Sequence, residues 1–204
     1  MSVERAVIPV DDLGAAIERF EAEGYRLVTI SPADDPRIAD LDGPDRRVRL
    51  DRTASEAAVI VVEDGPLHIP ALTPELVVSR AEAADHGSGR AGMRYRDLIP
   101  SRLGGRFIAS HIAIPGGGPV PDYVHHHDIR FQLIFCHAGW VEVVYEDQGE
   151  PFVMRPGDCV IQPPHIRHRV LASGDDLEVV EIGCPAEHDT HRDHELTLPT
   201  DGAD

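Results

Sequence analysis

The residues most capable of chemistry in this chain are closely spaced histidines. His125 and His127 are two positions apart, so on an extended strand both imidazoles project from the same face. Inside a β-barrel, two such imidazoles can chelate one divalent metal ion. Gln132 follows at an odd offset and can face the same way only if the chain turns or bulges at residues 128–129. We therefore expect a metal site that includes His125, His127 and Gln132.

A second stretch, RPGDCVIQPPHIRHRV at residues 155–170, adds His168 from a strand distant in the sequence. Three neutral imidazoles and an amide oxygen would leave room for water or substrate on an octahedral metal. Gln132 is expected to ligate directly, the alternative being a barrel residue that only orients the ligands. The competing interpretation of the histidines is a polar surface cluster. His126, which faces the other way, is expected to be solvated or to lie in an interface.

The two stretches resemble, in order and spacing, the two motifs of the cupin superfamily. The first motif runs glycine, His-x-His, an acidic residue and a second glycine, and its positions here are Gly118, His125, His127, Gln132 and Gly139. The resemblance implies a cupin-type jelly-roll barrel, a double-stranded β-helix, with one divalent metal in its centre. It also implies a homodimer.

The second cupin motif runs Pro-Gly-Asp, a short strand, Pro-x-Gly and a final histidine. It corresponds to residues 156–158, residues 163–165 and His168, so the resemblance covers roughly residues 104–186. His165 stands where the family prefers glycine. Histidine tolerates the left-handed backbone better than most residues, which suits a turn. The alternative is an extra imidazole that lines the pocket.

Gln132 stands where the family usually has glutamate. The ligands would then carry no negative charge, and a bound cation would keep its full double charge. This predicts weaker metal retention, favours a small anionic substrate as the missing ligand, and removes one candidate carboxylate base. Arginine is the natural partner of an anion, and Arg130 shares the side of Gln132 by even spacing. Arg130, Cys136 and His165 are the candidates for substrate binding, and the sequence names no catalytic residue.

The chain before the barrel is expected to form a unit of its own at residues 1–65, in the order βαβββ. Through the segment IPVDDLGAAIERFEAEGYRLV and this element order, the unit resembles one half of a vicinal-oxygen-chelate (glyoxalase-type) module. No histidine precedes His68, so we interpret this unit as a non-catalytic packing or dimerisation domain. The expected elements are strands at 6–10, 25–30, 47–51 and 57–62, a helix between 12 and 24, and a loop at 31–43.

The remaining segments complete a fold class that is mainly β with an α+β N-terminal unit. Residues 66–103 are rich in proline and glycine and are expected to be a connector. Residues 104–186 contain many short strand-like segments, as a sandwich or barrel requires. Residues 187–204 form a polar tail that is expected to fray or to lie over the surface.

Composition excludes several functions of the 204-residue chain. All 19 basic residues are arginine, so a lysine Schiff base and a P-loop lysine are excluded. The net charge of −17 argues against nucleic-acid binding. No apolar run approaches the length of about 18 residues that a membrane span needs, and the start lacks a signal-peptide core. Three cysteines without a C-x-x-C pair indicate reduced thiols, so we expect a cytoplasmic protein.

By resemblance, the leading activity is that of a metal-dependent dioxygenase acting on a small anionic organic substrate bound directly to the metal. Fe(II) is the preferred ion, Mn or Ni are alternatives, and Zn is disfavoured because it has no redox chemistry. Two other classes stay open. One is a lyase or isomerase that uses the metal only as a Lewis acid. The other is a non-catalytic ligand-binding cupin.

Overall fold

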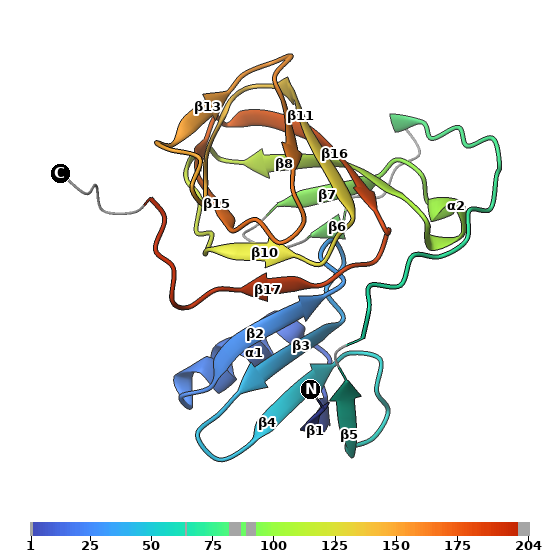
Figure 1. The fold of residues 1–204 in the computed structure, drawn as a ribbon, viewed down its shortest axis with the longest axis vertical. Coiled ribbons are helices and arrows are strands. Elements are labelled where there is room, and N and C mark those ends of the chain that lie inside the picture. The colour runs from blue at the N-terminus through green and yellow to red at the C-terminus, as the bar shows by residue number, and fades with distance from the viewer. Residues whose placement is uncertain (1, 64, 82–86, 89–92, 200–204) are drawn as a thin grey trace.

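The computed structural model describes residues 2–63, 65–81, 87–88 and 93–199 (Figure 1). A β-barrel built from the later part of the chain lies above a smaller unit built from the first part. The expected class, mainly β with an α+β N-terminal unit, is confirmed by the element order. In the described part of the chain, no helix is long and apolar enough to cross a membrane.

The N-terminal unit is a sheet with one helix packed on it. Its elements are β1 (Ser2–Pro9), α1 (Leu13–Ala22), β2 (Arg26–Ser31), β3 (Ile38–Asp42), β4 (Arg47–Asp51) and β5 (Ala58–Glu63). The strand order is β2-β3-β4-β1-β5. Asp12 caps α1 by accepting a hydrogen bond from the backbone N–H of Ala15. Leu13 and Phe20 are buried on the inner side of the helix, against the sheet.

The prediction of a loop at residues 31–43 is wrong in its second half, where β3 lies inside the sheet. Ala39 and Leu41 are fully buried, and Asp40 between them pairs with Arg49 at 2.7 Å. The aspartates next to Leu41 made the segment look like a loop, although its side chains alternate as a strand requires. The unit thus has one strand more than the expected βαβββ order, and its resemblance to a glyoxalase-type module stays a prediction.

The barrel consists of two walls of antiparallel strands. Its elements are β6 (Gly87–Ser88), β7 (Arg94–Asp97), α2 (Arg102–Gly105), β8 (Ile108–Pro115), β9 (Gly118–Pro119), β10 (His125–His127), β11 (Phe131–Ala138), β12 (Val141–Tyr145), β13 (Phe152–Met154), β14 (Cys159–Gln162), β15 (His168–Ser173), β16 (Asp176–Cys184) and β17 (Thr190–Arg192). One wall has the order β13-β12-β15-β10-β17 and the other β14-β11-β16-β8-β7-β6. Residues such as Ile112, Met154 and Leu177 form the core between them.

The C-terminal tail is part of the fold, contrary to the prediction that residues 187–204 fray or lie over the surface. β17 pairs with β10 on one side and with β2 on the other, so it joins the barrel wall to the N-terminal sheet. His188 and Leu198 are buried. The sequence analysis missed this strand because its residues are polar. The backbone hydrogen bonds of β17 are made with β10 and β2, which are remote in sequence. Residues 200–204 lie outside the described part.

The end of the expected connector belongs to the barrel. β7 pairs with β8 along its length, and Met93 just before it is buried in the barrel core. The barrel therefore begins before the predicted boundary at residue 104, because its second wall includes both β6 and β7. Within the connector, residues 82–86 and 89–92 lie outside the described part.

Candidate metal centre

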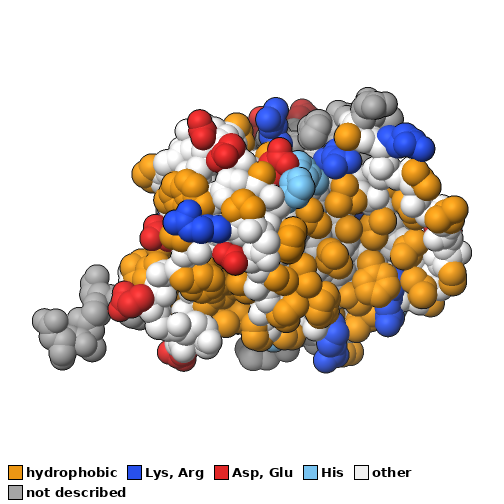
Figure 2. Space-filling model, turned by 90° about the horizontal axis from the view of Figure 1, so that it is seen from above, with side chains coloured by type: hydrophobic (Ala, Val, Ile, Leu, Met, Phe, Trp, Pro, Cys, Tyr) orange, Lys and Arg blue, Asp and Glu red, His pale blue; other side chains and the backbone are white. Residues whose placement is uncertain are grey.

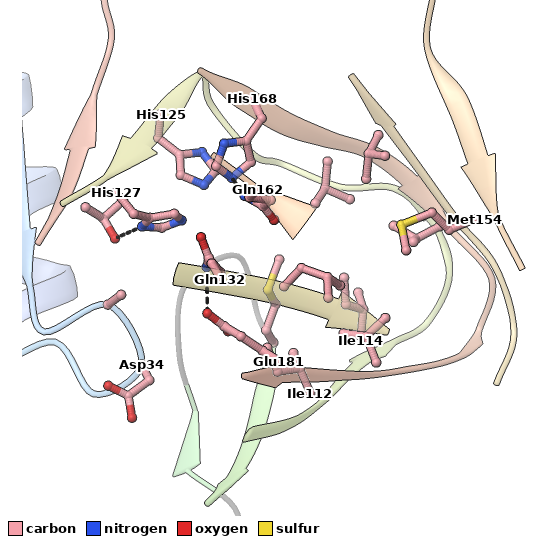
Figure 3. Close-up of a pocket in the computed structure, with 18 of the residues that line it drawn as sticks. Asp34, Ile112, Ile114, His125, His127, Gln132, Met154, Gln162, His168 and Glu181 are labelled. Carbon is pink, nitrogen blue, oxygen red and sulfur yellow. Dashed lines mark hydrogen bonds between the residues drawn. The ribbon is translucent and has the colours of Figure 1, made fainter. Parts of the chain in front are cut away.

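Three buried histidines meet at one end of the barrel cavity (Figure 3). β10 places His125 and His127 on its inner face, and β15 brings His168 beside them because His125 and His168 are register partners. The ring centroids lie 4.3 Å (His125–His168), 5.0 Å (His125–His127) and 5.3 Å (His127–His168) apart. Their ligand atoms all lie within 4.8 Å of one another. The structure thus brings together the histidines of both stretches.

The Nδ1 atom of each ring lies within hydrogen-bonding distance of an oxygen. These oxygens are Tyr123 O for His125 (2.8 Å), Thr190 Oγ1 for His127 (3.0 Å) and Ile166 O for His168 (2.9 Å). A backbone carbonyl can only accept, so in His125 and His168 the proton sits on Nδ1 and the lone pair on Nε2. The hydroxyl of Thr190 permits the same tautomer in His127. Fixing the outer nitrogen in this way orients imidazoles for metal binding, so the donor set fits a divalent cation.

Gln132 faces the histidines from the opposite wall, on β11 (Figure 3). Its Nε2 donates a hydrogen bond of 2.7 Å to Oε1 of Glu181, and both side chains are buried. An ionised carboxylate can only accept, so the amide nitrogen must face Glu181 and the amide oxygen is left for the cavity. The structure therefore presents Gln132 as an oxygen donor. Whether it ligates a metal stays a prediction.

The sequence analysis missed Glu181. Its carboxylate lies behind Gln132 and supplies the negative charge that the ligands themselves lack. Its signal was its position on β16, where Leu177, Val179 and Glu181 occupy successive inward-facing positions. Gly183, directly opposite Gln132, leaves that inward position without a side chain, since a Cβ there would lie 2.9 Å from Cδ1 of Ile129. Glu181 is then the diagonal neighbour that reaches Gln132.

Gln162 is a second amide at the centre. It lies opposite Gln132 in the β11–β14 pairing, and its Nε2 is 3.0 Å from Nε2 of His168. With the proton of His168 on Nδ1, this contact is a hydrogen bond from the amide to the imidazole lone pair. A metal ion bound at this nitrogen would replace that hydrogen bond, so Gln162 must turn when a metal binds.

The whole cavity has a volume of about 110 Å³, and beyond its polar end it is mostly apolar. Side chains such as Ile112, Ile114, Met154 and Leu177 line it beyond the histidines (Figure 3). Tyr145 stacks on His168 with 5.4 Å between ring centroids, and burial raises the pKa of its phenol, which stays protonated. The cavity therefore combines a polar end with an apolar chamber, an arrangement typical of small-molecule sites.

The N-terminal unit also contributes to the cavity, through Ala33 and Asp34 from the loop between β2 and β3 (Figure 3). Oδ2 of Asp34 pairs with Arg102, whereas its buried Oδ1 makes no hydrogen bond to any described residue. No local pattern in the sequence pointed to Asp34, because its position depends on how the two parts of the chain pack. The N-terminal unit thus supplies part of the cavity wall, and its non-catalytic role stays a prediction.

The three expected substrate-binding residues are not among those that line the cavity. Arg130 is exposed, because the chain leaves β10 after His127 and the parity of β11 does not extend back to it. Cys136 is fully buried in the barrel core, where burial raises the pKa of its thiol. His165 is exposed at φ +63°, in the expected turn, with Nδ1 3.1 Å from Oδ1 of Asp128.

Fold and site thus define a small β-barrel with an internal three-histidine centre. Residues 110–183, which lie within the barrel, match the family model described as "Cupin domain". No curated protein matches the sequence.

Among solved structures, the chain is similar to an RmlC-like cupin from Shewanella frigidimarina NCIMB 400, with 21% identity over 56% of this chain and 96% of that one and a TM-score of 0.46. It is similar to the polyketide cyclase RemF from Streptomyces resistomycificus, with 20% identity over 61% and 89% and a TM-score of 0.47. It is also similar to KdgF from Halomonas sp., with 21% identity over 52% and 90% and a TM-score of 0.43.

Proposed function

We propose that the barrel is a metal-dependent enzyme, a dioxygenase, with His125, His127, His168 and Gln132 as its metal ligands. The observation that carries the proposal is the convergence of three imidazoles, with Nδ1 held by oxygens, at the polar end of an apolar cavity. Bound there, a divalent cation would supply Lewis acidity, and Fe(II), Mn or Ni would add redox chemistry. The residues leave part of an octahedral coordination shell for a substrate.

The substrate is a small organic anion with an apolar body. Among the described residues that line the cavity, none is an arginine, so the cation itself would neutralise the anionic group. The chamber around Ile114 and Leu177 would hold the apolar body and exclude water. Glu181 and Asp34 are the carboxylates among the described residues of the cavity wall. They would repel an anion that binds away from the metal, which favours one orientation of the substrate.

A metal-dependent lyase or isomerase is the second candidate, and the same two carboxylates favour it. Reactions of this class move a proton, and a carboxylate close to the bound substrate can accept or return it. Asp34 suits this role because its Oδ1 is buried and makes no hydrogen bond to any described residue. In this mechanism the cation would act only as a Lewis acid. A cupin that binds a ligand without turnover is the remaining alternative.

The test begins with elemental analysis of protein purified without added metal. We expect about one Fe, Mn or Ni ion per chain in the cavity, lost in His127→Ala. The wild type is then supplied with small carboxylic and hydroxy acids, in air and without oxygen. Oxygen consumption supports the dioxygenase, and turnover without oxygen supports the lyase or isomerase. A cavity that retains no metal in any form would overturn both.

We also propose that the chain forms a homodimer through the outer face of β14, β11 and β16. Phe131, Phe135, Ile161 and Ile182 are exposed on these adjacent strands, and Figure 2 shows a broad area of hydrophobic side chains on the barrel. A patch of this kind on one copy can cover the same patch on another through a two-fold axis.

The dimer is tested by light scattering of the wild type, which should give twice the chain mass of 22.3 kDa. We expect Ile161→Glu to give monomers, whereas Val61→Glu, at a somewhat more exposed position on β5, should leave the dimer intact. A monomeric wild type would contradict the proposal.

A further inference from the structure

The outer face of β10 carries a second cluster of metal-ligating side chains. His126 points away from the cavity because its neighbours on the strand point into it. Its register partner on β17 is His191, and the two rings stack at 5.0 Å with an interplanar angle of 15°. Asp128 bridges two imidazoles, with Oδ2 2.9 Å from Nε2 of His191 and Oδ1 3.1 Å from Nδ1 of His165.

One potential ligand atom from each of His126, Asp128 and His191 lies within 4.8 Å of the other two. Nδ1 of His126 is buried and makes no hydrogen bond to any described residue, which is costly for a polar atom. His165 adds a further imidazole, with its ring centroid 5.9 Å from that of His126. Four potential ligands thus come from β10 and the residue after it, from β17, and from the turn before β15.

We propose that His126, Asp128 and His191 bind a second divalent cation of the zinc type on this outer face, with His165 as the fourth ligand. Three imidazoles and one carboxylate are a donor set that Zn²⁺ binds tetrahedrally at about 2.0 Å from each ligand. Two ligands of such an ion lie roughly 3.3 Å apart by that geometry. The 2.9 Å and 3.1 Å contacts of Asp128 are already close to this separation.

The position of this cluster points to a structural role. Four protein ligands leave a tetrahedral ion no open position for a substrate. The opposite nitrogen of His191, Nδ1, lies 3.1 Å from Oγ1 of Thr29 on β2, so the N-terminal sheet holds this ligand in place. A cation here would cross-link β10, β17 and the turn at His165. This cross-link would lie where β17 pairs with both the barrel wall and the N-terminal sheet.

The experiment is a calorimetric titration of the metal-free full-length chain with Zn²⁺. The wild type should bind two ions per chain. His126→Phe keeps a ring for stacking on His191 but removes a ligand, so it should bind one, as should the cavity variant His127→Ala. The matched control is His111→Phe on the outer face of β8, which should still bind two. The double variant lacking His126 and His127 should bind none with comparable affinity.

Circular dichroism shows whether each variant is folded, and Asp128→Asn, which preserves side-chain shape, provides a second test if His126→Phe is not. Zn²⁺ should also raise the Tm of His127→Ala, an effect that Asp128→Asn should abolish in that background. The proposal is overturned if the wild type binds a single ion that is lost in His127→Ala. It is equally overturned if His126→Phe or Asp128→Asn, when folded, retains two. A single ion lost only in His126→Phe would support the outer site and contradict the cavity site.

Discussion

Replacing Glu181 by glutamine is expected to weaken metal binding in the cavity while leaving every proposed ligand in place. Glu181 accepts a 2.7 Å hydrogen bond from Nε2 of Gln132, and this contact turns the amide oxygen toward the histidines. Glutamine at position 181 can offer either an oxygen or an NH₂ group. Gln132 would then no longer be held in one orientation, and the negative charge behind it would be lost.

Two independent estimates give the size of the effect. A buried hydrogen bond to a charged group contributes about 1.5–3 kcal/mol, which corresponds to roughly 10- to 150-fold in an equilibrium constant. Mutation of residues that orient metal ligands lowers metal affinity by about 10- to 100-fold. We therefore expect the Kd for Ni²⁺ in Glu181→Gln to rise by about 10- to 100-fold.

The Kd is measured by competition with a chromogenic chelator, in a His126→Phe background that removes the outer cluster. Glu178→Gln is the matched control, because Glu178 lies on the same strand with its side chain on the outer face, 3.1 Å from Nε2 of His111. The control should bind Ni²⁺ as its parent does. If Glu181→Gln and Glu178→Gln bind the ion equally well, the proposed role of Glu181 is refuted.

Two further predictions concern the segment after residue 187. Thr190→Val removes the oxygen 3.0 Å from Nδ1 of His127 and should weaken metal binding about tenfold in the same assay. Unchanged affinity would contradict the role of Thr190 in orienting His127. Asp193→Asn should destabilise the fold by about 1.5–3 kcal/mol at pH 7 in urea unfolding. Burial raises the pKa of Asp193, but hydrogen bonds from two backbone N–H groups and Arg167 outweigh it, so the pKa falls below 3.8. The stabilisation from the ionised carboxylate is present above that value and is lost as the pH falls through the pKa of the folded state. The difference in free energy of unfolding between the wild type and Asp193→Asn should therefore shrink toward pH 3. A difference that stays constant with pH would contradict this role of the carboxylate.

Local pattern was sufficient to predict the histidine centre and the barrel. Side-chain alternation decides which face of a strand each residue occupies, so the spacing of His125 and His127 already placed both on one face. His168 could be added because the two stretches match the cupin motifs. Likewise, the break expected between His127 and Gln132 is real, since β10 ends at His127 and β11 begins at Phe131.

Other parts of the site depend on packing between distant segments, which a single sequence does not encode locally. Asp34 lines the cavity, and the segments that hold the N-terminal sheet against the barrel, such as β17, are remote from it in sequence. β17 itself is three residues long and polar, so neither its composition nor its length marked it as a strand. The prediction for Arg130 failed for a different reason. The alternation of side chains along the strand of Gln132 was extended back to Arg130, although β11 begins only at Phe131.

The pair formed by Gln132 and Glu181 changes how the charge of the site must be understood. From the sequence, glutamine in place of glutamate meant ligands without negative charge and a cation with its full double charge. The structure does have a carboxylate at the site, that of Glu181 on the neighbouring strand β16. It contacts Gln132 and lies behind this residue as seen from the histidines. An ion held by three imidazoles and this amide would be neutralised less than by a direct carboxylate ligand, yet it would not be uncompensated. Such a centre should bind an anionic substrate tightly at the metal and disfavour a second anion, because Glu181 lies in the cavity wall.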